Sequence, residues 1–191
     1  MRIDLPNLVG SGELYLDIMR IICGDTSELS MVDLGCHKAP YTSQLGFKYR
    51  RYVDALPRPL DNPEEQQYFI QDDMLDYLQW NRFITDVAIS SDSIEHLTIA
   101  SGYELITLMI MRSKKQIIFT PTGETMMNIF LDNDYDTHKS GWTPEMLPTW
   151  LAIVLPNFHP TMDAGAWFAV NCEPKEMERI YNTIKSKYDH E

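Results

Sequence analysis

Hydrophobic and polar residues follow one another along the chain in patterns that predict a helix and several short buried strands. Residues 11–24 read SGELYLDIMRIICG, and their apolar side chains recur at intervals of three and four positions. Ser11 can accept a hydrogen bond from the first turn and Gly24 can end the helix, so we expect a capped amphipathic helix here. Short apolar runs predict buried strands at residues 31–34, 52–53, 68–70, 87–89 and 116–119.

Helical segments separate most of these strands. They are predicted at residues 63–67, 74–81 and 93–111, and the last is long enough for a full helix. Alternating strands and helices favour a parallel sheet with helices on both faces. No internal repeat, low-complexity segment or linker interrupts the pattern, and we expect one domain over residues 1–191.

The order of elements changes after residue 119. Thr143 and Pro144 have the chemistry of a helix start, with a cap followed by proline at the first helical position. A pair of strands is predicted near residues 158–162 and 166–170. The stretch PKEMERIYNTIKSKY predicts a closing helix over residues 174–188.

Composition narrows the class of protein. Hydrophobic residues make up 44% and charged residues 23%, which is typical of a folded soluble domain. The widely spaced Cys23, Cys36 and Cys172 suit neither a disulfide framework nor a paired zinc motif. The first residues carry no apolar core of signal-peptide length, and no segment reaches about 18 uninterrupted apolar residues. We therefore expect a cytoplasmic protein without a membrane span.

The net charge of -12 argues against nucleic acid as a partner, because a phosphate backbone would be repelled without a local basic strip. Lys48, Arg50 and Arg51 form the densest basic cluster, which is too small for such a footprint. An acidic loop, LDNDYDTHKSGWT, has alternating aspartates, but Thr137 and Thr143 replace the glycine and glutamate of an EF-hand. We reject a calcium loop and expect no metal site.

Acidic residues come at the ends of two predicted strands. Met31 to Leu34 would empty into a tight turn at Gly35, where the lack of a Cβ lets a ligand approach the backbone. Asp33 stands two residues before this glycine, and Asp54 ends the next strand 21 positions later. This separation places a second acid where doubly wound sheets hold a ribose. The glycine turn alone is equally explained as a structural turn, and the two features together indicate an α/β sheet with acids at its strand ends.

At this point the sequence resembles class I S-adenosylmethionine-dependent methyltransferases, over most of its length and in the expected order of motifs. MVDLGCHKA is similar to their glycine-rich first motif, YVDAL to the second and FIQDDMLDYL to the third. TDVAISSDSIEHL resembles the fourth strand with its "iEHl" tail, and IIFTPTGE a fifth strand ending in "TP". HKSGWTPEML resembles the segment that opens the substrate-side helix in small-molecule members.

The resemblance implies a fold, a cofactor and an activity. The fold would be a doubly wound, mostly parallel seven-stranded sheet with helices on both faces and the last strand antiparallel. The activity would be transfer of a methyl group from S-adenosylmethionine to an oxygen, nitrogen or carbon atom of a small molecule. By the same resemblance, the cofactor-binding residues would be Asp33, Gly35, Cys36, His37, Asp54, Asp73, Met74 and Ser91.

Within that resemblance, Asp54 matches the acid that holds the ribose hydroxyls, and Asp73 matches the acid that faces the adenine amino group. His37 and Ala39 depart from the family, because they replace glycines that line the methionine part of the cofactor. This departure keeps open a second class of function, a catalytically silent binding protein with the same fold. A nicotinamide-binding oxidoreductase is a third reading, which Asp33 disfavours.

Methyl transfer depends on proximity and alignment, so a general base is optional. His96 is the first candidate base because its ordinary pKa suits proton removal near neutrality, and Asp92 and His138 are weaker candidates. Each has a structural alternative as a packing, capping or loop residue. The apolar helix at residues 93–111 could bury against its own sheet or against a second subunit, and a homodimer stays open.

Overall fold

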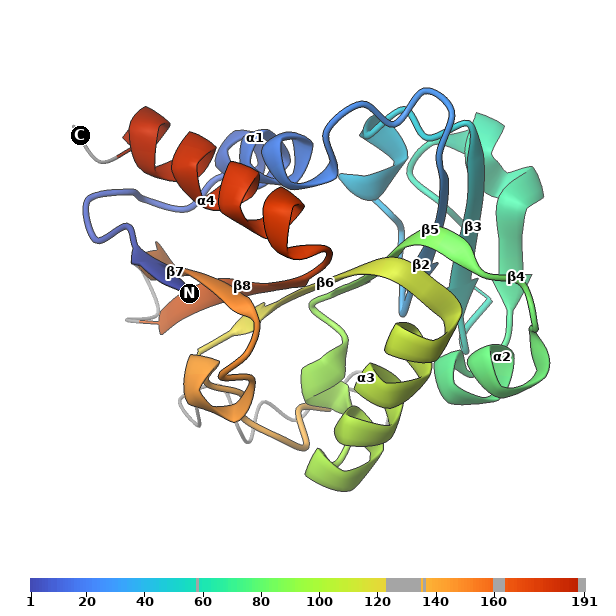
Figure 1. Cartoon of the computed structure of the whole chain (residues 1–191). Coiled ribbons are helices and arrows are strands. Elements are labelled where there is room, and N and C mark those ends of the chain that lie inside the picture. Colours follow the sequence, from blue (N-terminus) through green and yellow to red (C-terminus); the bar gives the residue numbers. More distant parts are fainter. Residues whose placement is uncertain (58, 123–134, 136, 160–163, 189–191) are drawn as a thin grey trace.

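The computed structural model describes residues 1–57, 59–122, 135, 137–159 and 164–188 (Figure 1). In this part of the chain eight strands form one sheet in the order β1-β7-β8-β6-β5-β2-β3-β4. Their bounds are β1 Arg2–Asp4, β2 Ser30–Leu34, β3 Tyr49–Asp54, β4 Phe69–Gln71, β5 Thr85–Ser91, β6 Ser113–Pro121, β7 Leu151–His159 and β8 Ala164–Asn171.

The sheet is mostly parallel, and β8 is the strand that runs against its neighbours. It pairs antiparallel with β6 on one side and with β7 on the other, whereas the remaining pairs are parallel. A mostly parallel sheet with its last strand reversed was predicted. The predicted number of seven strands was wrong, because β1 adds an eighth at the edge beside β7, with Ile3 opposite Ile153. Three residues are too few for a recognisable strand pattern.

Two apolar cores lie on opposite faces of the sheet, because successive strand residues point to opposite sides. Met31, Tyr52 and Ile89 belong to one core, and Val32, Val53 and Ala88 belong to the other. Helices α1 (Gly12–Cys23) and α4 (Pro174–Tyr188) cover the first face, and α2 (Met74–Trp80) and α3 (Ile99–Arg112) cover the second (Figure 1).

Helix α1 forms as its sequence predicts. The Ser11 Oγ accepts a hydrogen bond of 3.1 Å from the Leu14 N–H, which satisfies a backbone donor of the first turn. Gly24 ends the helix with φ of 72°, and its N–H donates to the Arg20 carbonyl. Ile18 and Met19 are fully buried against the sheet, so the apolar side of the helix faces the core.

The predicted helix over residues 93–111 was wrong in its first turn. The structure has a one-turn 3-10 helix, η3 (Ile94–His96), followed by α3. Thr98 separates them because its backbone is extended and its Oγ1 accepts a hydrogen bond from the Ser101 N–H. His96 therefore lies before the long helix, at the edge where the strands end.

The prediction was also wrong around β7. The apolar run LAIVL forms most of this strand, seven residues before the predicted start at residue 158, and its partner β8 begins at Ala164. Residues 160–163 lie outside the described residues, as do the aspartates of the rejected calcium loop. Thr143 occupies an N-cap position as predicted, but Pro144–Met146 make only a 3-10 turn, η5, because the chain then enters β7.

Helix lengths and hydropathy bear on membrane insertion. No helix in the described part of the chain is long and apolar enough to cross a bilayer.

Candidate functional site

A cavity of about 320 Å³ opens at the carboxyl ends of the parallel strands, where β2 and β5 lie side by side. From β2 the chain crosses to β3 on one side, whereas β5 leads to β6 on the other, so this is the switch point at which α/β sheets bind ligands. The lining includes the eight proposed cofactor-binding residues and two of the three candidate bases: Asp33, Gly35, Cys36, His37, Asp54, Asp73, Met74, Ser91, Asp92 and His96.

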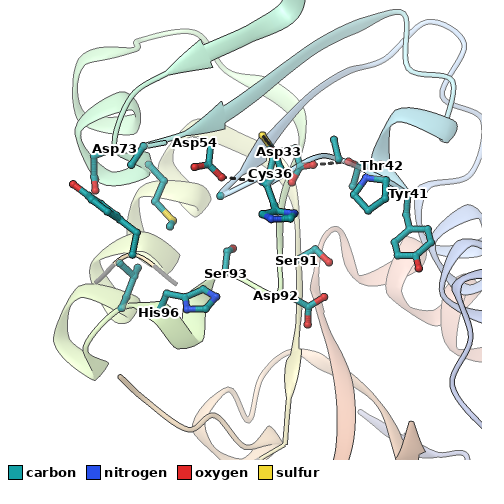
Figure 2. Close-up of a pocket in the computed structure, with 18 of the residues that line it drawn as sticks. Asp33, Cys36, Tyr41, Thr42, Asp54, Asp73, Ser91, Asp92, Ser93 and His96 are labelled. Atoms are coloured by element: carbon teal, nitrogen blue, oxygen red, sulfur yellow. Dashed lines mark hydrogen bonds between the residues drawn. The ribbon is translucent and has the colours of Figure 1, made fainter. Parts of the chain in front are cut away.

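Figure 2 shows how these side chains are distributed. Asp54 and Asp73 lie on one side of the cavity, and Ser91, Asp92 and His96 lie on the other. The first side is built by the strands β3 and β4, and the second by the segment after β5. The size of the cavity is at the lower end of the range for small-molecule and cofactor sites.

The turn after β2 brings the backbone close to the cavity. Gly35 has φ of 70°, and a Cβ added there would lie 2.6 Å from the Ser93 Cβ. The N–H groups of Gly35 and Cys36 both donate to the Val53 carbonyl, at 2.8 and 3.0 Å. These bonds fasten the turn to β3, and only glycine fits its first position.

The two residues that replace family glycines adopt the conformation that glycine favours. His37 has φ of 49° and Ala39 has φ of 48°, both in the left-handed region. The His37 side chain is exposed, whereas Ala39 is buried and lines the cavity. The loop therefore keeps its path without the glycines, with Cβ atoms held in a strained backbone.

Asp33 is buried at the base of the cavity, with an exposed fraction of 2%. Its Oδ2 accepts a hydrogen bond from the Thr42 hydroxyl. Its Oδ1 is buried and has no hydrogen-bond partner in the described part of the chain. Burial raises the pKa of Asp33 to about 7, with a further contribution from the charge of Asp54, while the Thr42 bond opposes the shift.

Asp54 and Asp73 each hold part of the local backbone. Asp54 accepts hydrogen bonds from the N–H groups of His37 at 2.8 Å and Leu56 at 2.9 Å. Asp73 is the N-cap of α2, and its Oδ1 accepts a bond of 2.8 Å from the Leu75 N–H. The acids of the second and third motifs are therefore fixed in place beside the cavity.

Several lining residues were missed from the sequence. Tyr15 of α1 is buried, and its hydroxyl donates to the Ser91 Oγ at 3.0 Å. Burial raises its pKa well above the ordinary value, so it stays a neutral donor. Ser93 is buried and its Oγ donates to the Leu34 carbonyl at 2.9 Å, which ties the turn after β5 to the end of β2. Both contacts join distant segments, so no local spacing signals them.

A second acid pair lies at the turn after β5. The backbone of Asp92 is left-handed, with φ of 47°, and its N–H donates to the Phe119 carbonyl. Desolvation by the surrounding protein raises the pKa of the Asp92 carboxyl. The side chain nevertheless reaches water in the open cavity. Glu95 is buried, accepts a bond of 2.9 Å from the Thr120 hydroxyl, and has its pKa raised to about 8 by burial and by Asp92.

The predicted candidate bases lie together. His96 lines the cavity, and its ring centroid is 4.8 Å from that of His138. Lys139, which follows His138, also lines the cavity. The sequence proposed His96 and His138 as separate candidates, whereas the structure makes them neighbours.

Two residues of the small basic cluster form ion pairs with acids. Arg50 pairs with Glu65, and Lys48 pairs with Glu28. The Arg51 guanidinium donates a hydrogen bond of 3.1 Å to the Tyr77 hydroxyl.

Comparison with known proteins gives the fold but no close relative. No protein-family model matches the sequence, and no curated protein sequence is significantly similar to it. Among solved structures, the N-methyltransferase NodS from Bradyrhizobium japonicum WM9 is similar with a TM-score of 0.63 at 13% identity, over 84% of this chain and 96% of that chain.

Two further structures are similar. The 1,6-didemethyltoxoflavin-N1-methyltransferase from Burkholderia thailandensis gives a TM-score of 0.59 at 11% identity, over 85% of this chain and 78% of that chain. The small RNA methyltransferase HEN1 gives 0.56 at 16% identity, over 82% of this chain and only 25% of that chain. The chain thus has the fold of class I S-adenosylmethionine-dependent methyltransferases.

Proposed function

We propose that this protein is a methyltransferase that takes the methyl group of S-adenosylmethionine, with residues 1–191 acting as one domain. The observation that carries the proposal is the convergence of Asp33, Asp54 and Asp73 on one cavity at the switch point of the sheet. These acids lie at the carboxyl ends of three different strands. In the resemblance, Asp54 holds the ribose hydroxyls, Asp73 faces the adenine amino group, and Asp33 is a characteristic position of the first motif.

The charge of the cavity supports this cofactor. Among the described lining residues, the charged side chains are Asp33, Asp54, Asp73, Asp92 and a single lysine, Lys139. S-adenosylmethionine carries a sulfonium and an ammonium group, which acidic walls attract, whereas a dinucleotide carries a pyrophosphate, which they repel. The same comparison disfavours the nicotinamide-dependent oxidoreductase.

The residues present fit the cofactor at its two ends. At the buried end, the Asp33 Oδ1 is available to accept a hydrogen bond from an ammonium group. At the open end, Asp54 is oriented by the His37 and Leu56 N–H groups to meet ribose hydroxyls, and Asp73 with Met74 borders the adenine position. Cys36, His37 and Ser91 complete the proposed cofactor-binding set.

When bound, the sulfonium supplies a methyl group with a good leaving group. The protein's task is to hold the acceptor in line and to exclude water, since alignment can lower a barrier by roughly 7 to 11 kcal/mol. His96 and Asp92 line the cavity opposite Asp54 and Asp73 and are the candidate groups to receive a proton from the acceptor (Figure 2).

We propose a small molecule as the methyl acceptor, attacked at oxygen, nitrogen or carbon. The net charge of -12 and the paired basic cluster disfavour a nucleic-acid acceptor. A cytoplasmic location and an optional homodimer remain predictions from the sequence.

One observation favours a second function, a catalytically silent binding protein. Ala39 places a Cβ in the cavity wall where the family has glycine, and its neighbour His37 is strained in the same way. A Cβ at such a position crowds a ligand that packs against the backbone.

Calorimetric titration with S-adenosylmethionine and S-adenosylhomocysteine tests the proposal. We expect saturable binding of one ligand per chain. Asp73→Asn should weaken it about tenfold or more, because asparagine keeps the helix cap but turns an amide donor toward the adenine amino group.

Asp76→Asn is the matched control for this experiment. Asp76 is exposed in the first turn of the same helix and does not line the cavity, so its loss of charge should leave affinity unchanged. No heat at millimolar ligand would overturn the proposal. Binding of both ligands without methyl transfer to any tested acceptor would favour the silent protein.

A further inference from the structure

Glu95, His96 and His138 form a cluster of the residue types that ligate transition metals. One ligand atom from each lies within 4.8 Å of the others. Glu95 and His96 are adjacent in η3, whereas His138 comes from a segment more than 40 residues later. The fold, and no sequence spacing, therefore brings them together.

Backbone hydrogen bonds hold His138 next to η3. The Glu95 carbonyl accepts from the Lys139 N–H at 2.7 Å and from the Ser140 N–H at 3.1 Å. Ser140 is in turn bonded by the indole N–H of Trp142, at 2.8 Å. Trp142 is fully buried and packs against α3, where a Cβ on Gly102 would lie 2.2 Å from its Cζ2. These contacts hold the segment that carries His138 beside η3.

Glu95 supplies a buried carboxylate with no lysine or arginine partner among the described residues. Its exposed fraction is 3%, and its side chain accepts a bond from Thr120. In the described part of the chain no lysine or arginine forms an ion pair with it. A buried carboxylate is costly unless it is protonated or paired with a positive charge. Asp92 lies three residues earlier at the cavity and is a second carboxyl group close enough to raise the pKa of Glu95.

We propose that Glu95, His96 and His138 form a binding site for a divalent first-row transition cation such as Mn²⁺, Co²⁺ or Zn²⁺. Two imidazoles and a carboxylate make the ligand set that holds such ions with coordination positions left open, whereas Mg²⁺ and Ca²⁺ prefer oxygen ligands throughout. Two atoms bonded to one such cation lie at most about 4.2 Å apart, and the three ligand atoms here lie within 4.8 Å of one another, so small side-chain movements bring them to bonding distance.

The site borders the cavity through His96, on the side away from Asp54 and Asp73 (Figure 2). On the proposed function, a cation there would bind an oxygen atom of the acceptor and lower the pKa of an acceptor hydroxyl. This consequence depends on methyl transfer, but the metal site itself does not, because it is argued from the cluster alone.

Titration of the metal-free, untagged full chain with MnCl₂ tests the proposal, with free Mn²⁺ followed by electron paramagnetic resonance. We expect binding of one Mn²⁺ per chain that saturates below millimolar metal. Glu95→Gln and His138→Ala should each weaken it about tenfold or more, since each removes a ligand. Glutamine at position 95 keeps nearly the same shape and an acceptor for the Thr120 hydroxyl, so Glu95→Gln should stay folded.

His159→Ala is the matched control, because His159 lies on β7 and does not line the cavity. Absence of saturable binding to the wild-type chain would overturn the proposal, and so would equal binding by Glu95→Gln, His138→Ala and the wild type. Circular dichroism establishes that each variant is folded. The S-adenosylmethionine titration is separate, so failure of the metal site and failure of the proposed function are distinguishable.

Discussion

The loop after β2 shows how two single residues strain the site. His37 and Ala39 have φ near +50°, where a Cβ clashes with the backbone and costs roughly 1–2 kcal/mol. Their neighbours hold them there, because the His37 N–H is bonded to Asp54 and the Ala39 N–H to the Cys36 carbonyl. The loop thus keeps a ligand-binding path at a cost in stability.

A pair of variants measures this strain. The free energy of unfolding should be about 1 kcal/mol higher for His37→Gly than for His37→Ala. Both variants lose the imidazole, but only alanine keeps a Cβ in the left-handed backbone. At an ordinary helical position alanine would be the more stable. Urea unfolding of the two variants gives the difference. Equal stability, or a more stable His37→Ala, would contradict the φ of 49°.

Asp33 should make stability depend on pH. Burial raises its pKa from 3.8 to about 7, so between these values the folded protein holds a proton that the unfolded chain has lost. The free energy of unfolding then falls as pH rises from about 4 to about 7 and levels off above that.

Asp33→Asn removes this titration while keeping an acceptor for Thr42. The stability of the wild type relative to Asp33→Asn should fall by about 1–4 kcal/mol between pH 4 and pH 8. Urea unfolding at several pH values measures this difference. Parallel stability curves for the two proteins would show that Asp33 is not a buried acid.

The acids of the site were predictable, because each follows an apolar run and strand ends meet at one edge of a parallel sheet. Tyr15 and Ser93 were not, since their roles rest on hydrogen bonds to Ser91 and to the Leu34 carbonyl, far away in sequence. The contact between the rings of His96 and His138 was equally unpredictable from the sequence, because the two residues are far apart along the chain.

At the scale of elements, α3 and the segment before β7 depend on one close contact. Gly102 of α3 is buried, and the ring of Trp142 fills the space where its side chain would be. Tyr103 contacts the same indole edge to face, with centroids 5.3 Å apart. The absence of a side chain at Gly102 thus lets Trp142 pack closely against α3 and hold the segment before β7 there.

Gly102→Ala should therefore destabilise the protein despite the higher helix propensity of alanine. The added Cβ would lie 2.2 Å from the Trp142 Cζ2, and overpacking of this kind costs typically 1–3 kcal/mol, against about 1 kcal/mol gained from propensity. Thermal unfolding measures the effect. Thr107→Ala, at an exposed position of the same helix, is the control and should leave stability unchanged or slightly raised.

Elements with their own caps and periodicity were predictable. Helices α1 and α4 match the predicted ranges within one residue at each end. The errors occur where one residue or a tertiary contact determines the secondary structure. Thr98 separates η3 from α3 within residues 93–111. The run LAIVL forms a strand because β8 pairs with it on one side and β1 on the other.

For the whole molecule, the fold class was predictable but the edge of the sheet was not. β1 has three residues and one buried side chain, Ile3, which is too short a pattern to predict a strand paired with β7. The sequence left open whether the apolar helix at residues 93–111 packs against its own sheet or against a second subunit. One side of α3 packs against its own chain, because Leu105, Ile106 and Met109 are buried in the core there. Ile110 and Met111 are exposed, and a homodimer through them stays a prediction.

The two bonds that the Glu95 carbonyl receives from Lys139 and Ser140 have a consequence for how such a protein can evolve. On the proposed function, most of the residues that hold the methyl donor come from the chain up to Met74, whereas the opposite wall includes Lys139, which comes much later in the sequence and is held by the Glu95 carbonyl. If the proposed function holds, insertions or exchanges in that later stretch would redirect the protein to new acceptors without changing most of the residues that bind the donor.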